Sequence, residues 1–153
     1  MRRLLATLLA PLIATSAFAE QTVWKTIDNW LITGDVKAGV CLASTEYVAT
    51  GQQLLIGEYD KGWSLAINGT NATQGTNYLT EIVTSNGARE ALAGVGLGQG
   101  LIIYKLGRGA VMQGLFVSDT VEFKGIGLFR IDGALAAMAA THACFEDITG
   151  SNT

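Results

Sequence analysis

The chain has 153 residues, of which thirteen are acidic and ten basic, for a formal net charge of −3. It contains no basic cluster and repels phosphate backbones, which excludes nucleic-acid binding. Only 15% of the residues are charged and 19 are glycine, so the composition predicts an ordered, turn-rich domain rather than a disordered chain.

The first nineteen residues have the three parts of a secretory signal peptide. Arg2 and Arg3 form a positive start, an apolar run covers 4–14, and Ala17-Phe18-Ala19 supplies the small residues of a cleavage site. The apolar run is well short of the roughly 20 residues that cross a bilayer, so we expect no stable membrane anchor. Cleavage would leave residues 20–153, a single β-rich exported domain with a periplasmic or secreted location.

Short apolar runs bounded by Gly, Asn or Asp predict strands through most of this domain. In chain order they are 30–33, 40–47, 54–59, 63–67, 78–84, 101–106, 120–124 and 126–131. In 63–67, Trp63, Leu65 and Ile67 share one side and small residues the other, which predicts a half-buried strand. The turn at 60–62 predicts that it pairs antiparallel with 54–59. The strand spacing predicts a mainly β fold, an antiparallel β-sandwich or barrel.

One C-terminal α-helix is predicted after these strands. Asp132 is a suitable N-cap, and 134–145 is rich in alanine with no Gly or Pro. At about 100° per residue, the helix has two stripes that could be buried: one of Leu135, Met138, His142 and Phe145, and a small-residue stripe of Ala137, Ala140 and Cys144. Either the sheet curls around the helix or one stripe meets a partner molecule.

Cys41 and Cys144 are the only cysteines, and an exported chain with an even number is expected to join them in a disulfide. A redox pair would need closely spaced cysteines, which these are not. With one histidine in the chain and both thiols consumed, we expect no metal site and no cofactor.

Gly94, Gly96, Gly98 and Gly100 alternate in a way that suggests a nucleotide-binding loop, but their spacing does not fit G-x-G-x-x-G. We expect instead a loop or strand with one bare face, which lets another part of the chain approach the backbone closely. A groove that faces a ligand is the alternative.

Two patterns are compatible with hydrolysis. Ser64 lies near a G-x-S-x-G arrangement that ends in Ala66, with Asp119 or Asp132 and His142 following in hydrolase order. The acidic residues form two close pairs that a glycosidase could use, Glu58 with Asp60 and Asp119 with Glu122. Turn residues flank both pairs, which is typical of solvated loops. Asn68 and Asn71 fit glycosylation sequons, which we interpret as turn chemistry.

An early tryptophan, Cys41, the Trp63-Ser-Leu-x-Ile strand, and Phe129-x-x-Asp-Gly-Ala-Leu-Ala-Ala ending at Cys144 together resemble small alphaproteobacterial periplasmic proteins of the invasion-associated locus B type. The resemblance spans most of the exported domain as a pattern. It implies a disulfide-bonded β-sandwich or barrel without catalytic residues, linked to host association or the cell envelope.

We therefore expect a non-enzymatic periplasmic or secreted module that binds an unknown protein or small molecule, or associates with the envelope. A homodimer is a further alternative for the partner. The rival hypothesis is a small secreted hydrolase that uses Ser64 with His142.

Overall fold

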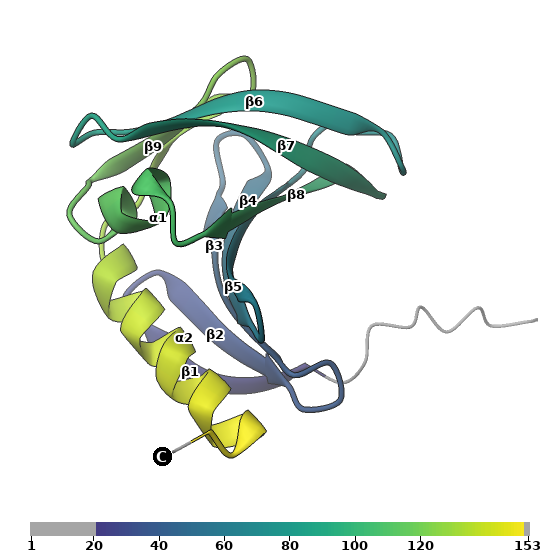
Figure 1. The fold of residues 1–153 in the computed structure, drawn as a ribbon. Helices are drawn as coiled ribbons and strands as arrows, with labels where there is room; N and C mark the ends of the chain where they lie inside the picture. The colour runs from purple at the N-terminus through teal and green to yellow at the C-terminus, as the bar shows by residue number, and fades with distance from the viewer. Residues whose placement is uncertain (1–20, 152–153) are drawn as a thin grey trace, which may run out of the picture.

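The computed structural model describes residues 21–151, so the predicted leader lies outside the described residues. Ten strands form one antiparallel sheet in the order β1-β2-β3-β4-β5-β8-β7-β6-β9-β10, and two helices pack against it (Figure 1). The elements are β1 (Thr22–Ile27), β2 (Trp30–Asp35), β3 (Val40–Tyr47), β4 (Gln52–Tyr59), β5 (Gly62–Asn68), β6 (Asn77–Thr84), β7 (Arg89–Gly98), β8 (Leu101–Gly107), α1 (Ala110–Leu115), β9 (Thr120–Phe123), β10 (Gly127–Arg130) and α2 (Ala134–Thr149).

The mainly antiparallel β fold with a C-terminal helix is confirmed. The predicted hairpin is present, since β4 pairs with β5 in a register that places Leu54 opposite Ile67 and Ile56 opposite Leu65. Alternate residues of each strand therefore project onto the same face of the sheet. One face carries the buried core, and the other carries the remaining side chains of the central strands.

The sheet curls so that its two ends approach each other. Side-chain contacts join them, and no backbone ladder between the described strands does so. The hydroxyl of Tyr47 on β3 donates to the carbonyl oxygen of Arg130 at 2.5 Å, and its ring meets that of Phe129 edge-on at 5.1 Å between centroids. The indole N–H of Trp30 on β2 donates to the Asp132 carbonyl oxygen at 2.8 Å. These contacts hold the segment after β10 against β2 and β3.

Helix α2 packs against β2, β3 and β4, and Figure 1 shows it lying alongside β2. Ala137, Ala140 and Cys144 are buried, whereas Leu135 is 57% exposed. Small side chains let the helix lie close to the sheet, where the Leu135 side of the helix would hold it further away. The small stripe therefore faces the core, together with Met138 of the other stripe, whereas Leu135 and His142 stay exposed.

The predicted N-cap is wrong. The residue before α2 is Gly133, which has a left-handed φ of 79° and no capping side chain. Asp132 instead forms an ion pair with Arg130, whose Nη2 lies 2.9 Å from Oδ2. Because the Asp132 carbonyl oxygen accepts from Trp30, the turn is held by the backbone of Asp132 rather than by its side chain.

Strand β5 is not half-buried as predicted, because both of its faces are covered. Ser64 and Ala66 are 6% and 7% exposed, although they lie on the face opposite Leu65 and Ile67. Trp63 is only partly buried, contrary to its predicted core position. It lies at the strand end beside a register shift against β8, so it reaches the rim of the core rather than its centre.

Candidate functional site

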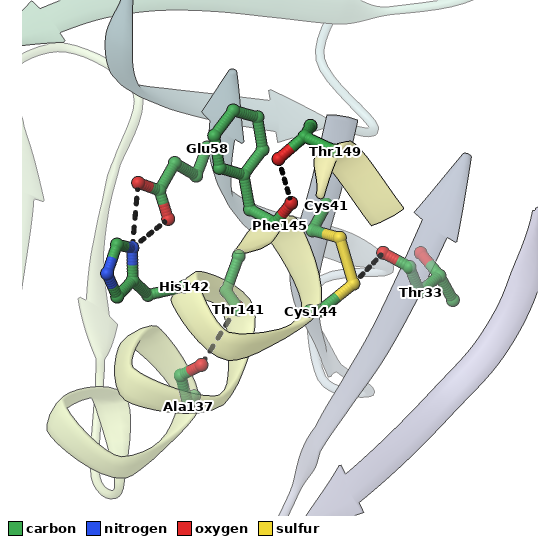
Figure 2. The surroundings of a disulfide bond; sticks show 9 residues. All are labelled: Thr33, Cys41, Glu58, Ala137, Thr141, His142, Cys144, Phe145 and Thr149. Carbon is green, nitrogen blue, oxygen red and sulfur yellow. Dashed lines mark hydrogen bonds and ion pairs between the residues drawn. A yellow bond between two sulfur atoms is a disulfide. The ribbon is translucent and has the colours of Figure 1, made fainter. Parts of the chain in front are cut away.

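The predicted disulfide joins Cys41 on β3 to Cys144 on α2, with 6.1 Å between the Cα atoms. Both residues are fully buried. Gly34 on the neighbouring strand makes room for the bridge, because a Cβ at this position would lie 3.1 Å from Cys144 Sγ. Figure 2 shows that the bridge and His142 project from different sides of the same helical turns. The disulfide thus ties the last helix to the middle of the sheet.

A second link between α2 and the sheet is a carboxylate-imidazole pair. His142 Nδ1 lies 3.0 Å from each carboxylate oxygen of Glu58 on β4, a geometry drawn in Figure 2. His142 Nε2 lies 3.3 Å from Glu146 Oε1, one helical turn further on. Because an ionised carboxylate only accepts hydrogen bonds, Nδ1 is the donor to Glu58, and Nε2 can donate to Glu146 only when both ring nitrogens are protonated.

Glu58 is the feature that the sequence interpretation placed wrongly. It is only 9% exposed, not part of a solvated loop. The register explains this, because Glu58 follows Leu54 and Ile56 at intervals of two and stands opposite Cys41 on the core-facing side. Burial raises the pKa of the Glu58 carboxyl above its ordinary value of 4.5, and the hydrogen bond and charge of His142 act in the opposite direction.

Glu58 lines a cleft of about 710 Å³ at the end of the β4–β5 hairpin. Its other described lining residues include the aromatic side chains Tyr59, Trp63 and Phe145 and the exposed ends of Lys61 and Arg108. The three side chains Glu58, His142 and Glu146 do not converge on one point, since the ring lies between the two carboxylates. Among residues 21–151, no group of three or more His, Cys, Asp or Glu side chains is arranged to hold a metal ion.

Ser64 and His142 lie on opposite faces of the sheet. Ser64 stands opposite Gly57, and the neighbouring pair, Trp63 opposite Glu58, faces α2. The Ser64 hydroxyl is buried and donates to the Gly57 carbonyl oxygen at 3.5 Å. The structure therefore does not bring together the serine and the histidine of the hydrolase hypothesis.

The remaining polar candidates have local partners or open surroundings. Glu122 lies 2.7 Å from Lys124 in an exposed ion pair, and Asp119 is exposed. Asn68 accepts the Gly69 N–H at 2.9 Å, which is the turn role expected for it. Asn71 is exposed in the same loop. Of the two acidic pairs, Glu58 and Asp60 both line the cleft at the end of the β4–β5 hairpin.

Gly94, Gly96 and Gly98 form the end of β7 and Gly100 lies in the turn after it; the bare face of this segment allows the close backbone approach that we expected. The loop at 70–76 continues the pairing along β7 beyond the start of β6, with Gly75 N–H donating to Gly96 O at 2.8 Å and Gly96 N–H donating to Thr76 O at 2.9 Å. A Cβ on Gly96 would collide with the carbonyl oxygen of Thr73. Because side chains alternate along a strand, this leaves Val95 and Leu97 to point to the opposite side.

That opposite side forms a groove of about 640 Å³ over β2, β3 and β4, with the β7–β8 turn as one wall. In Figure 1 this turn projects beyond β5 on the side away from α2. The described residues that line the groove are five leucines, five side-chain amides, two hydroxyl residues and one glycine: Leu31, Leu42, Leu55, Leu97, Leu101, Gln21, Gln53, Asn68, Gln74, Gln99, Thr33, Ser44 and Gly98. None of them is charged or aromatic.

The floor of the groove is made of close-packed strand residues. Leu42 on β3 leans across the bare backbone of Gly57 on β4, where a Cβ would lie 2.7 Å from Leu42 Cδ2. Leu31, Ser44 and Leu55 follow one another across β2, β3 and β4 in the ladder register. The sequence carried signals for the Gly94–Gly100 wall but none for this floor, which depends on which strands are neighbours.

Comparison of the chain with protein-family models, with curated proteins and with solved structures finds no match.

Proposed function

We propose that this chain is an exported, non-enzymatic binding module whose binding surface is the uncharged groove on the outer face of the sheet. The observation that carries the proposal is the composition of that groove. Leu31 and Leu97 are 38% and 51% exposed in it, and all its described lining residues are uncharged. Apolar surface gathered in a concave place and edged by a few polar groups is the usual character of a ligand site.

The export and envelope parts of the proposal rest on the sequence. The leader pattern before Glu20 supports a periplasmic or secreted location, and the buried disulfide between Cys41 and Cys144 fits an oxidising compartment. Within residues 21–151 no helix is long and apolar enough to cross a membrane. Association with the cell envelope follows from the resemblance to proteins of the invasion-associated locus B type.

A hydrolase is the weaker proposal, because its two named residues face different sides of the sheet. His142 contacts Glu58 and Glu146, and the hydroxyl of the buried Ser64 donates to a backbone carbonyl oxygen of β4. A nucleophile and its base must come within hydrogen-bond distance for the mechanism to work.

The binding proposal is tested with a neutral apolar dye, 1-N-phenylnaphthylamine, whose fluorescence rises in apolar surroundings. The full chain, expressed with its own leader, should bind the dye saturably with one site per chain. Leu97→Asp should weaken this binding at least tenfold. Leu79→Asp is the matched control, because Leu79 is 79% exposed on the same face but outside the groove.

Equal dye binding by the two variants would contradict the proposal. The same preparations test export, because intact mass of the exported product should place Glu20 or its neighbour at the N-terminus. A product that retains Met1 would contradict the leader.

A further inference from the structure

The ligand class of the groove follows from its charge, its polar rim and the backbone of its wall. This ligand class rests on the proposed function, because it concerns the same groove. The other cleft, beside Glu58, has charged residues of both signs in its lining, so its chemistry does not select a ligand in the same way.

Neutrality is the first constraint on the ligand. A carboxylate, phosphate or ammonium group that enters the groove loses hydration and meets no described side chain of opposite charge. An uncharged group does not incur this cost. The five leucines offer apolar area to a flexible hydrocarbon body, at about 25 cal/mol per Å² removed from water.

Polar amides supply the second constraint. Gln21, Gln53, Asn68, Gln74 and Gln99 each bring a carbonyl acceptor and an NH₂ donor to the groove. Such groups hydrogen-bond to hydroxyl and ester oxygens without needing a charge on the ligand. A pure hydrocarbon would leave any amide that it covered without a partner.

The backbone of the wall is the third observation. The two-residue turn between β7 and β8 has positive φ at Gln99 (53°) and Gly100 (77°), as a type I′ hairpin loop requires. Such positions favour Asn, Asp or Gly, whereas glutamine in this region is strained. The hydroxyl of Thr70 donates to Gly100 O at 2.7 Å and holds the turn in place. Gln99 is the one groove amide placed on a left-handed backbone, which points to a role for its side chain.

We infer that the groove binds a neutral amphiphile, a molecule with one long hydrocarbon chain on the leucines and an uncharged hydroxyl or ester head group on the amides. A monoacylglycerol is the simplest member of this class. The fatty acid with the same chain differs mainly in its head group, whose carboxylate has no partner in the groove.

The test is displacement of bound 1-N-phenylnaphthylamine by monoolein and by oleate at pH 8, both below their aggregation concentrations. Monoolein should displace the dye with an affinity at least tenfold higher than oleate. Gln53→Lys places an ammonium group in the groove and should reverse the preference toward oleate. Gln99→Gly should weaken the binding of monoolein at least threefold. The melting temperature should stay the same or rise, because glycine adopts the left-handed turn conformation without strain.

Equal affinity for both lipids, or a preference for oleate in the unmodified chain, would overturn the inference. Displacement by an uncharged leucine- and glutamine-rich peptide but not by monoolein would overturn it too, in favour of a protein partner. The two proposals fail separately, since dye binding that survives Leu97→Asp contradicts the groove itself, whereas dye binding without lipid selectivity contradicts only the ligand class.

Discussion

Replacing His142 by alanine removes the partner of a buried carboxylate and should make stability strongly dependent on pH. The imidazole contributes contacts of 3.0 Å to both oxygens of Glu58, which is only 9% exposed. Loss of a partner by a buried polar group costs about 1–3 kcal/mol. The side chain of His142 is itself 54% exposed, so water enters readily and we expect the lower half of that range at pH 7.

The sign of the pH dependence follows from Glu58. Its carboxyl pKa is raised in the folded state, above the ordinary 4.5, by burial. The folded state therefore holds this proton more tightly than the unfolded chain, and the group reduces stability as pH rises from about 4.5 through the raised pKa. Because His142 lowers the pKa of Glu58 in the folded state, its removal widens the pH range over which stability is lost. The destabilisation by His142→Ala should thus be largest at pH 7 and shrink by pH 4, where Glu58 is protonated.

Urea unfolding of both proteins at pH 7 and pH 4 measures this difference. Glu58→Gln is the matched control, since it removes the charge and keeps the shape, and His142→Ala in that background should cost less at pH 7. Glu146→Ala removes only the more exposed contact of the ring and should change stability by less than about 0.5 kcal/mol. The same destabilisation by His142→Ala at both pH values would refute the role given to Glu58.

Three further predictions concern the core. Removing the disulfide with Cys41→Ala/Cys144→Ala opens a link between residues 103 apart, and should cost about 2–5 kcal/mol; an unchanged melting temperature after reduction of the wild type would count against it. Leu65→Ala should cost about 2–5 kcal/mol in urea unfolding, while Leu128→Ala, at a position 66% exposed, should cost under about 0.5 kcal/mol. Gly96→Ala should destabilise by more than about 1 kcal/mol, because the methyl meets a backbone carbonyl; an unchanged free energy of unfolding would contradict the close approach of the 70–76 loop to Gly96.

The elements that depend on local pattern were predictable from the sequence. Alternation around Leu65 located the β4–β5 hairpin, alanine content located α2, and the cysteine count located the disulfide. The close approach of another part of the chain to the glycine segment was predicted as well, because Gly94 and Gly96 have no side chains to keep it away. Apart from the number of cysteines, these signals are short-range: each depends on residues that are neighbours in the sequence.

The features that the sequence did not predict depend on contacts between distant parts of the chain. Strand β1 shows little alternating burial, because it is an edge strand with mostly exposed side chains. Glu58 could have been identified as core-facing from its interval of two after Leu54 and Ile56. A buried carboxylate needs a partner, however, and only the fold shows that His142 supplies it. The groove floor needed the order of β2, β3 and β4, which no local motif encodes.

A ¹H–¹⁵N NMR titration of the chain with 1-N-phenylnaphthylamine locates the binding surface directly. If the groove binds the dye, shift changes should concentrate on the amides of Leu31, Leu42, Leu55 and the turn at 97–101, with little change at Glu58 and His142. Changes centred on the Glu58 cleft, or the absence of saturable changes at the groove, would contradict binding in the groove.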